Sequence, residues 1–190
     1  MRKTIYTGIT IISLLLFVGA CATLTQYQIY SYDMLFGKDF LKDKKYTDAR
    51  KYFQDASALY KDSAALTYLA VVEYKMGNTE GALKHLQEAE KAGTDQVLYL
   101  RILGYKTLML FKTDREKGTA ALRDYVNYYQ HQYPLMSIKD VREMLQTGQV
   151  DTKRLEELID EQVSTYEQEI DQFLSDGTGF YDRHGSRPVH

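Results

Sequence analysis

The spacing of the apolar residues most constrains the fold of this chain. From about Tyr30 to Tyr133 they recur at intervals of three and four residues, which is the period of an α-helix rather than of a strand. The chain has two prolines, Pro134 and Pro188, so no proline interrupts this stretch. Its 190 residues are 44% hydrophobic and 26% charged, which suits one globular domain. We therefore predict an all-α protein.

Two segments of this helical body repeat one pattern 33 residues apart. Each has the stripe small, large, small: Ala49, Phe53 and Ala56 in the first, then Ala82, Leu86 and Ala89 in the second. A small side chain is needed where two helices cross closely, and a large one fills the gap beside it. Gly37 and Ala70 fit the small crossing position, and Gly77 fits a turn. The pattern resembles the tetratricopeptide (TPR) family, which implies a solenoid of stacked helical hairpins that binds other proteins.

The resemblance covers residues 30–133 and divides them into units of about 30–62, 63–95 and 97–133. The third unit has Leu103-Gly104 at the crossing position, but its second helix follows about three residues too late. It is either a lengthened repeat that ends at Pro134 or a helical hairpin of other ancestry.

Two further helices are expected over 134–175, followed by a polar, flexible tail over 176–190. Ser137 and Asp140 form an approximate capping box for the first, which Gly148 ends, and Asp151 caps the second. The second helix has an apolar stripe: Leu155, Leu158, Ile159, Val163, Tyr166, Ile170, Phe173 and Leu174. We predict that these helices cap the last repeat, although a partner-binding amphipathic helix is an alternative. Acidic residues crowd the second helix and indicate either a solvated face or a strip that attracts a basic partner.

The first twenty residues have the pattern of a secretory signal. Arg2 and Lys3 precede an apolar run over 5–18, which closes on Gly19 and Ala20. The run is shorter than the ~20 residues that span a bilayer as a helix. With Cys21, the lone cysteine, Val18-Gly19-Ala20 resembles the lipobox of bacterial lipoproteins, which implies cleavage after residue 20 and a diacylglycerol on Cys21. A plain signal peptide with an incidental cysteine, or an uncleaved anchor, stays open.

The resemblance to lipoproteins implies a place for the chain. Residues 21–29 would be a lipidated start and short linker, and the domain would face the periplasm from the outer membrane if the cell is Gram-negative. Removal of residues 1–20 leaves 22 basic and 26 acidic side chains, a net charge of about −4. That negative charge argues against a nucleic-acid partner. It also leaves no basic surface to hold the protein on anionic lipid, so the lipid on Cys21 alone would hold the protein at the membrane.

The sequence holds no constellation of catalytic groups. Its four histidines, His85, His131, His184 and His190, are scattered, and no nucleophile or phosphate-loop motif is present. We therefore predict a protein that is not an enzyme, with no metal, no cofactor and no small-molecule substrate.

The TPR resemblance also implies a binding groove on the first helix of each unit. The residues at its positions are Met34, Lys38, Leu41, Lys42, Thr67, Val71, Tyr74, Lys75, Arg101, Tyr105 and Leu108. Apolar bulk mixed with basic side chains suits a partly acidic envelope protein or peptide. The asparagines and lysines that capture a C-terminal carboxylate in some TPR domains are not in register. The function would be a membrane-anchored scaffold or assembly factor; a permanent subunit that uses its acidic last helix is the alternative.

Overall fold

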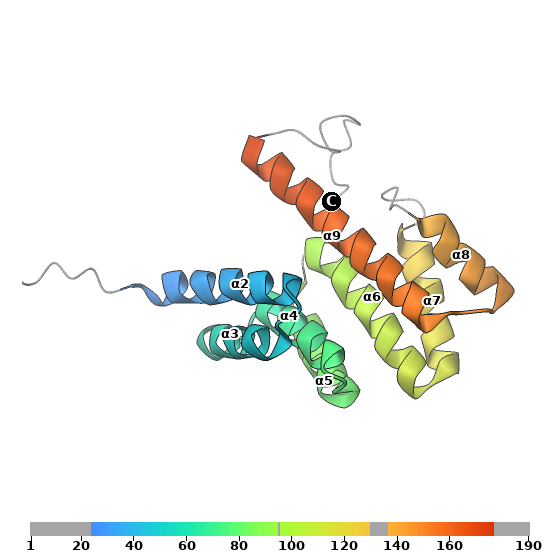
Figure 1. Cartoon of the computed structure of the whole chain (residues 1–190), viewed down its shortest axis with the longest axis horizontal. Coiled ribbons are helices and arrows are strands. Elements are labelled where there is room, and N and C mark those ends of the chain that lie inside the picture. The colour runs from blue at the N-terminus through green and yellow to red at the C-terminus, as the bar shows by residue number, and fades with distance from the viewer. Residues whose placement is uncertain (1–23, 95, 130–136, 177–190) are drawn as a thin grey trace, which may run out of the picture.

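The computed structural model describes residues 24–94, 96–129 and 137–176 (Figure 1). Within these ranges the chain forms eight helices and no strand. The first six are α2 (Gln26–Lys42), α3 (Tyr46–Leu59), α4 (Ser63–Lys75), α5 (Thr79–Ala92), α6 (Gln96–Thr113) and α7 (Arg115–Tyr129). The last two are α8 (Ile138–Thr147) and α9 (Thr152–Asp176). The predicted all-α class is confirmed.

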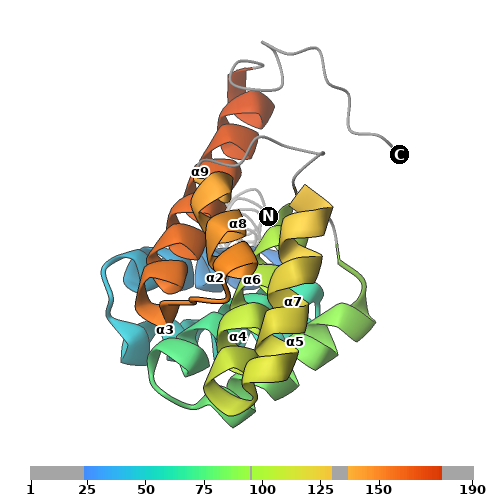
Figure 2. The same cartoon turned by 90° about the vertical axis from the view of Figure 1, so that its right-hand side faces the viewer.

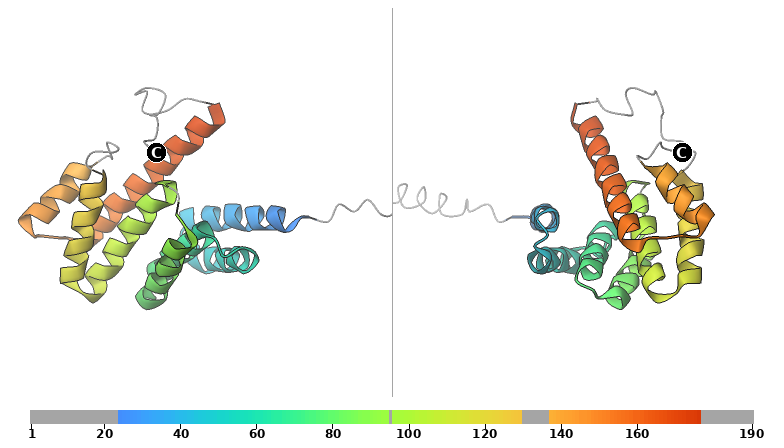
Figure 3. Two further views of the ribbon diagram at one scale, coloured as in Figure 1. Left: turned by 180° about the vertical axis from the view of Figure 1, so that it is seen from behind. Right: turned by 45° about the vertical axis from the view of Figure 1, so that its right-hand side comes forward.

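The first six helices form three hairpins that stack as in a TPR solenoid. α2 packs on α3, α4 on α5 and α6 on α7, while α3 also contacts α4 and α5 contacts α6. Among the first helices of the hairpins, α4 also contacts both α2 and α6. Figures 1 and 3 show these hairpins following one another, with α2 at one edge of the molecule.

The predicted small-large-small stripes form the contacts inside the first two hairpins. Ala49, Phe53, Ala56, Ala82, Leu86 and Ala89 are all at most 1% exposed. A Cβ atom built on Gly37 would lie 2.6 Å from the ring of Phe53, so only glycine allows α2 and α3 to approach this closely. The close crossing predicted at Gly37 is therefore confirmed.

The helix ends follow local sequence signals. Thr25 and Gln28 form a capping box that starts α2 at Gln26, so the helix begins inside the linker predicted over 21–29. Asp62 and Asn78 cap α4 and α5 through their side-chain oxygens. At the end of α4, Gly77 has the positive φ (89°) that its predicted turn requires.

The two C-terminal helices cover the last hairpin. α8 packs on α7 and α9 packs on α6, as Figure 2 shows from the side of α8. Asp151 caps α9 by accepting hydrogen bonds from the backbone N–H groups of Lys153 and Arg154, as predicted. The capping box predicted at Ser137 is wrong: Ser137 has a left-handed φ of 57°, and its side chain makes no capping hydrogen bond.

Several predictions fall outside the described residues. They concern the signal segment 1–20, the lipidated Cys21, Pro134 and the tail beyond residue 176. Among the described helices, none combines the length and the apolar character that crossing a bilayer requires.

Candidate functional site

The predicted groove lies on one side of α4 and α6, and α9 fills most of it. Leu155, Leu158, Ile159, Val163 and Tyr166 of α9 are at most 6% exposed and belong to the same apolar core as the last two hairpins. A Cβ atom built on Gly104 of α6 would lie 2.6 Å from the side chain of Ile159. Gly104 therefore allows α9 to approach α6 closely. The sequence pattern had predicted this glycine at the crossing of the two helices within the third hairpin.

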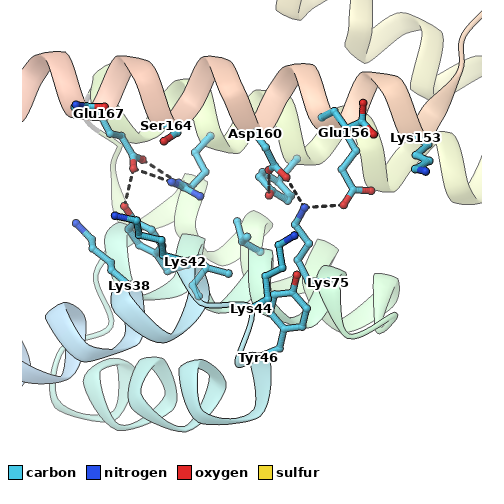
Figure 4. Close-up of a pocket in the computed structure, with 17 residues that line it drawn as sticks. Lys38, Lys42, Lys44, Tyr46, Lys75, Lys153, Glu156, Asp160, Ser164 and Glu167 are labelled. Carbon is cyan, nitrogen blue, oxygen red and sulfur yellow. Dashed lines mark hydrogen bonds and ion pairs between the residues drawn. The ribbon is translucent and has the colours of Figure 1, made fainter.

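The groove arginine binds a carboxylate of α9. Nε and Nη2 of Arg101 donate to the two carboxylate oxygens of Glu167 over 2.9 and 2.7 Å, a bidentate pair (Figure 4). The guanidinium also lies 4.5 Å from the ring centroid of Tyr68, whose hydroxyl donates to Glu167. Burial alone would lower the pKa of Arg101, but the neighbouring Tyr68 and Glu167 more than offset this, and its pKa is raised. Arg101 therefore stays charged inside the fold.

A second cluster joins Lys75 of α4 to two acids one turn apart on α9. Its Nζ donates to Glu156 and to Asp160, each over 2.6 Å, and Figure 4 shows it between them. The hydroxyls of Tyr74 and Tyr105 donate to the same two carboxylates. Burial alone would lower the pKa of Lys75, but the hydrogen bonds and charges of the two acids raise it overall. The cluster therefore holds α9 in the groove by paired charges.

The structure therefore corrects the expected exposure of most groove residues. Thr67, Val71, Tyr105 and Leu108 are at most 1% exposed; Met34, Tyr74 and Arg101 are at most 8% exposed. Of the two interpretations of the acids on the last helix, the solvated face is wrong for Glu156, Asp160 and Glu167, because their carboxylates pair with Lys75 and Arg101 of the groove. The chain itself supplies the partly acidic, partly apolar helix that this surface suits. Whether an external partner also contacts it stays a prediction.

Part of the predicted groove remains open as a cleft of about 850 Å³ between α2 and α9. We call it the lysine cleft, because Lys38, Lys42 and Lys44 extend into it from α2 and the turn that follows (Figure 4). Lys38 lies 4.9 Å from the ring centroid of Tyr68. The side chains of Lys42 and Lys44 form no ion pair or hydrogen bond with any described residue.

The lining of the lysine cleft is net positive. Six basic and four acidic side chains line it: Lys38, Lys42, Lys44, Lys75, Arg101 and Lys153, against Glu156, Glu157, Asp160 and Glu167. The remaining lining residues are Leu41, Tyr46, Tyr68, Val71, Tyr105, Ser164 and Gln168. Lys75 and Arg101 pair with three of the four acids, and the six bases against four acids leave a net charge of +2. An entering segment therefore meets an excess of positive charge on a chain that is negative as a whole.

Lys44 occupies a position where the backbone favours glycine. Its φ is 61°, and the N–H groups of Lys44 and Lys45 bond back to the carbonyls of Leu41 and Phe40, the Schellman ending of a helix. Gly77, 33 residues later, has the same role after α4. A lysine in this conformation costs about 1 kcal/mol relative to glycine. Lys44 was not predicted from the sequence, although its alignment with Gly77 places a non-glycine residue where the turn favours glycine.

Comparison with known proteins agrees with this architecture. The tetratricopeptide repeat family model matches residues 40–104, from the end of α2 into the middle of α6. The TPR-like repeats predicted from the two stripes are thus confirmed, and the protein is an all-α, TPR-like helical solenoid. Such repeats generally mediate protein–protein interaction. Neither the comparison with curated proteins nor that with solved structures gave a match.

Proposed function

We propose that this protein is a lipid-anchored adaptor of the cell envelope and that its lysine cleft binds an acidic segment of a partner protein. The repeats belong to a class that binds proteins, and the open part of the predicted groove is net positive. In this proposal the protein acts by binding and catalyses no reaction. The observation that carries it is Lys44, which lines the cleft and has a backbone conformation that favours glycine, because such strain tends to occur at binding sites.

The anchoring half of the proposal is supported by the sequence. Cys21 follows directly after the signal-like segment 1–20, and the capping box of α2 begins four residues after Cys21. A lipid on Cys21 would hold the folded domain within a few tens of ångströms of the bilayer. In a Gram-negative cell, the proposal is an outer-membrane protein that faces the periplasm.

The alternative, a permanent subunit that docks through its acidic last helix, gains no support. Glu156, Asp160 and Glu167 of α9 already pair with Lys75 and Arg101 of the same chain. A partner that used these acids would have to break ion pairs whose basic members are mostly buried.

Crosslinking in intact cells tests the proposal. A photoreactive phenylalanine at Tyr46, which lines the cleft, should capture a partner that mass spectrometry can identify. The double change Lys42→Glu and Lys44→Glu should abolish capture. Lys91→Glu with Lys61→Glu is the matched control, because it alters the charge equally at one exposed last-turn lysine and one exposed loop lysine. Equal capture in both variants, or no captured protein, would refute the lysine cleft as the binding site.

A further inference from the structure

Among the described residues, the exposed large apolar side chains gather on α2 and just before it. Of nine large hydrophobic residues exposed in the described part of the chain, six lie between residues 24 and 36: Leu24, Tyr27, Ile29, Tyr32, Leu35 and Phe36. Tyr32, Leu35 and Phe36 are 50%, 53% and 45% exposed. A concentration of this kind on one element marks a contact surface, whereas single exposed apolar residues do not.

Four of these residues share one face of α2. At 100° per residue, Ile29, Tyr32, Leu35 and Phe36 fall within an arc of about 120°. We call this arc the α2 stripe. Met34 and Gly37, which are buried against the neighbouring helices, lie on the opposite side of α2. Phe36 lies at the edge of the stripe, with its ring centroid 5.6 Å from that of Tyr52 of α3. The exposed side chains of Ile29, Tyr32 and Leu35 face away from the solenoid.

The chain itself indicates what covers the stripe. Cys21 precedes the cap residue Thr25 by four residues, and an extended chain spans at most about 3.5 Å per residue. If Cys21 bears the lipid, the start of α2 lies within about 15 Å of acyl chains inserted in the bilayer. Figure 1 shows this end of α2 projecting from the body of the molecule. An apolar helix face that includes tyrosine, held this close to lipid, suits the headgroup boundary.

We infer that the α2 stripe lies on the bilayer surface and fixes the orientation of the whole domain. This inference rests on the lipid anchor of the proposed function. Contact ends near Asp39, because this exposed carboxylate follows on the same face of the helix. Around α2, Lys38 lies about 120° and Lys42 about 80° from the centre of the stripe. The lysine cleft therefore stays open to an envelope partner while the stripe is on the membrane.

The experiment measures the depth of single labels in the lipidated full-length protein. The lipid consumes the only cysteine, so an introduced cysteine is the only free thiol. An NBD fluorophore is attached at Leu35→Cys, and in a second variant at Tyr32→Cys. Gln87→Cys, on the exposed side of α5, is the matched control. The proteins are reconstituted in phosphatidylethanolamine–phosphatidylglycerol vesicles with or without nitroxide-labelled phosphatidylcholine, and mass spectrometry confirms the lipid on Cys21.

We expect emission at positions 35 and 32 to shift to shorter wavelength and the nitroxide lipid to quench most of it, with neither effect at position 87. Ile29→Ser with Tyr32→Ser should reduce the quenching at position 35, which excludes insertion driven by the fluorophore alone. A lipidated protein that is unquenched at positions 35 and 32 would overturn the inference and leave the anchor intact. A wavelength shift that depends on protein concentration, without quenching, would assign the stripe to a second copy and also overturn it. An unmodified Cys21 would instead refute the anchor itself, and the inference with it.

Discussion

The replacement Glu167→Gln tests whether paired charges hold α9 in the groove. It keeps the shape of the side chain but removes the charge that compensates Arg101. The side chain of Arg101 is 10% exposed and that of Glu167 is 19% exposed, so the guanidinium would lose its counter-ion in a largely water-excluded site. Removing one member of a buried pair costs about 3–5 kcal/mol. Because water reaches part of Glu167, we expect a loss of about 2–4 kcal/mol in the free energy of unfolding.

The assay is urea unfolding of residues 22–190, followed by far-UV circular dichroism. Glu161→Gln is the matched control: it removes the same charge from an exposed position of α9 and should change stability by less than about 0.5 kcal/mol. The double change Arg101→Met and Glu167→Met should recover most of the loss, because a buried pair can be replaced by apolar side chains at little cost. The loss should persist in high salt, since salt screens buried pairs weakly. Equal effects of Glu167→Gln and Glu161→Gln would refute this account of the groove.

Three further predictions concern the turn, the helix crossing and pH. Lys44→Gly should raise the free energy of unfolding by about 1 kcal/mol in urea titrations, because glycine adopts the positive φ without strain, and it should weaken partner capture. Gly104→Ala should destabilise the fold by about 1–3 kcal/mol in the same titration, because the new methyl group meets the side chain of Ile159, and Ile159→Ala should partly rescue it. Burial alone would raise the pKa of Glu156, but the hydrogen bond and charge of Lys75 lower it overall. The stabilisation of the fold by ionised Glu156 is therefore complete above its unfolded pKa of about 4.3 and is lost as the pH falls below that value. Glu156→Gln should accordingly reduce the drop in the urea midpoint between neutral and acidic pH.

The solenoid could be predicted because its signals are local. The stripe Ala49, Phe53, Ala56 and its repeat indicate helix crossings within one hairpin, whose two helices are neighbours in the sequence. Asp151 predicted its helix end for the same reason. Ser137 failed because its backbone has a positive φ, which a match of residue types does not reveal. Lys44 was missed because a lysine gives no turn signal, although its backbone adopts the same turn as Gly77.

The groove could be predicted only in part, because its occupant comes from a distant part of the chain. Lys75 and Arg101 were predicted among its basic residues, and one of the two interpretations of the acids on the last helix was a strip that attracts a basic partner. The two predictions describe opposite sides of one contact. Complementary charge shows that two surfaces suit each other, but it does not show whether they belong to one chain or to two. The structure shows that the two surfaces belong to one chain, because five apolar side chains of α9 are buried beside these ion pairs.

The self-occupied groove also bears on where a partner can bind. Displacing α9 would expose Leu155, Leu158, Ile159, Val163 and Tyr166, and at about 1.5–3 kcal/mol each this costs on the order of 10 kcal/mol. A partner with micromolar affinity supplies only about 8 kcal/mol at the standard state. Such a partner could not hold α9 out of the groove, since the cost of opening exceeds what binding returns. The lysine cleft requires no such displacement, so an acidic segment of modest affinity can bind there while α9 remains in place.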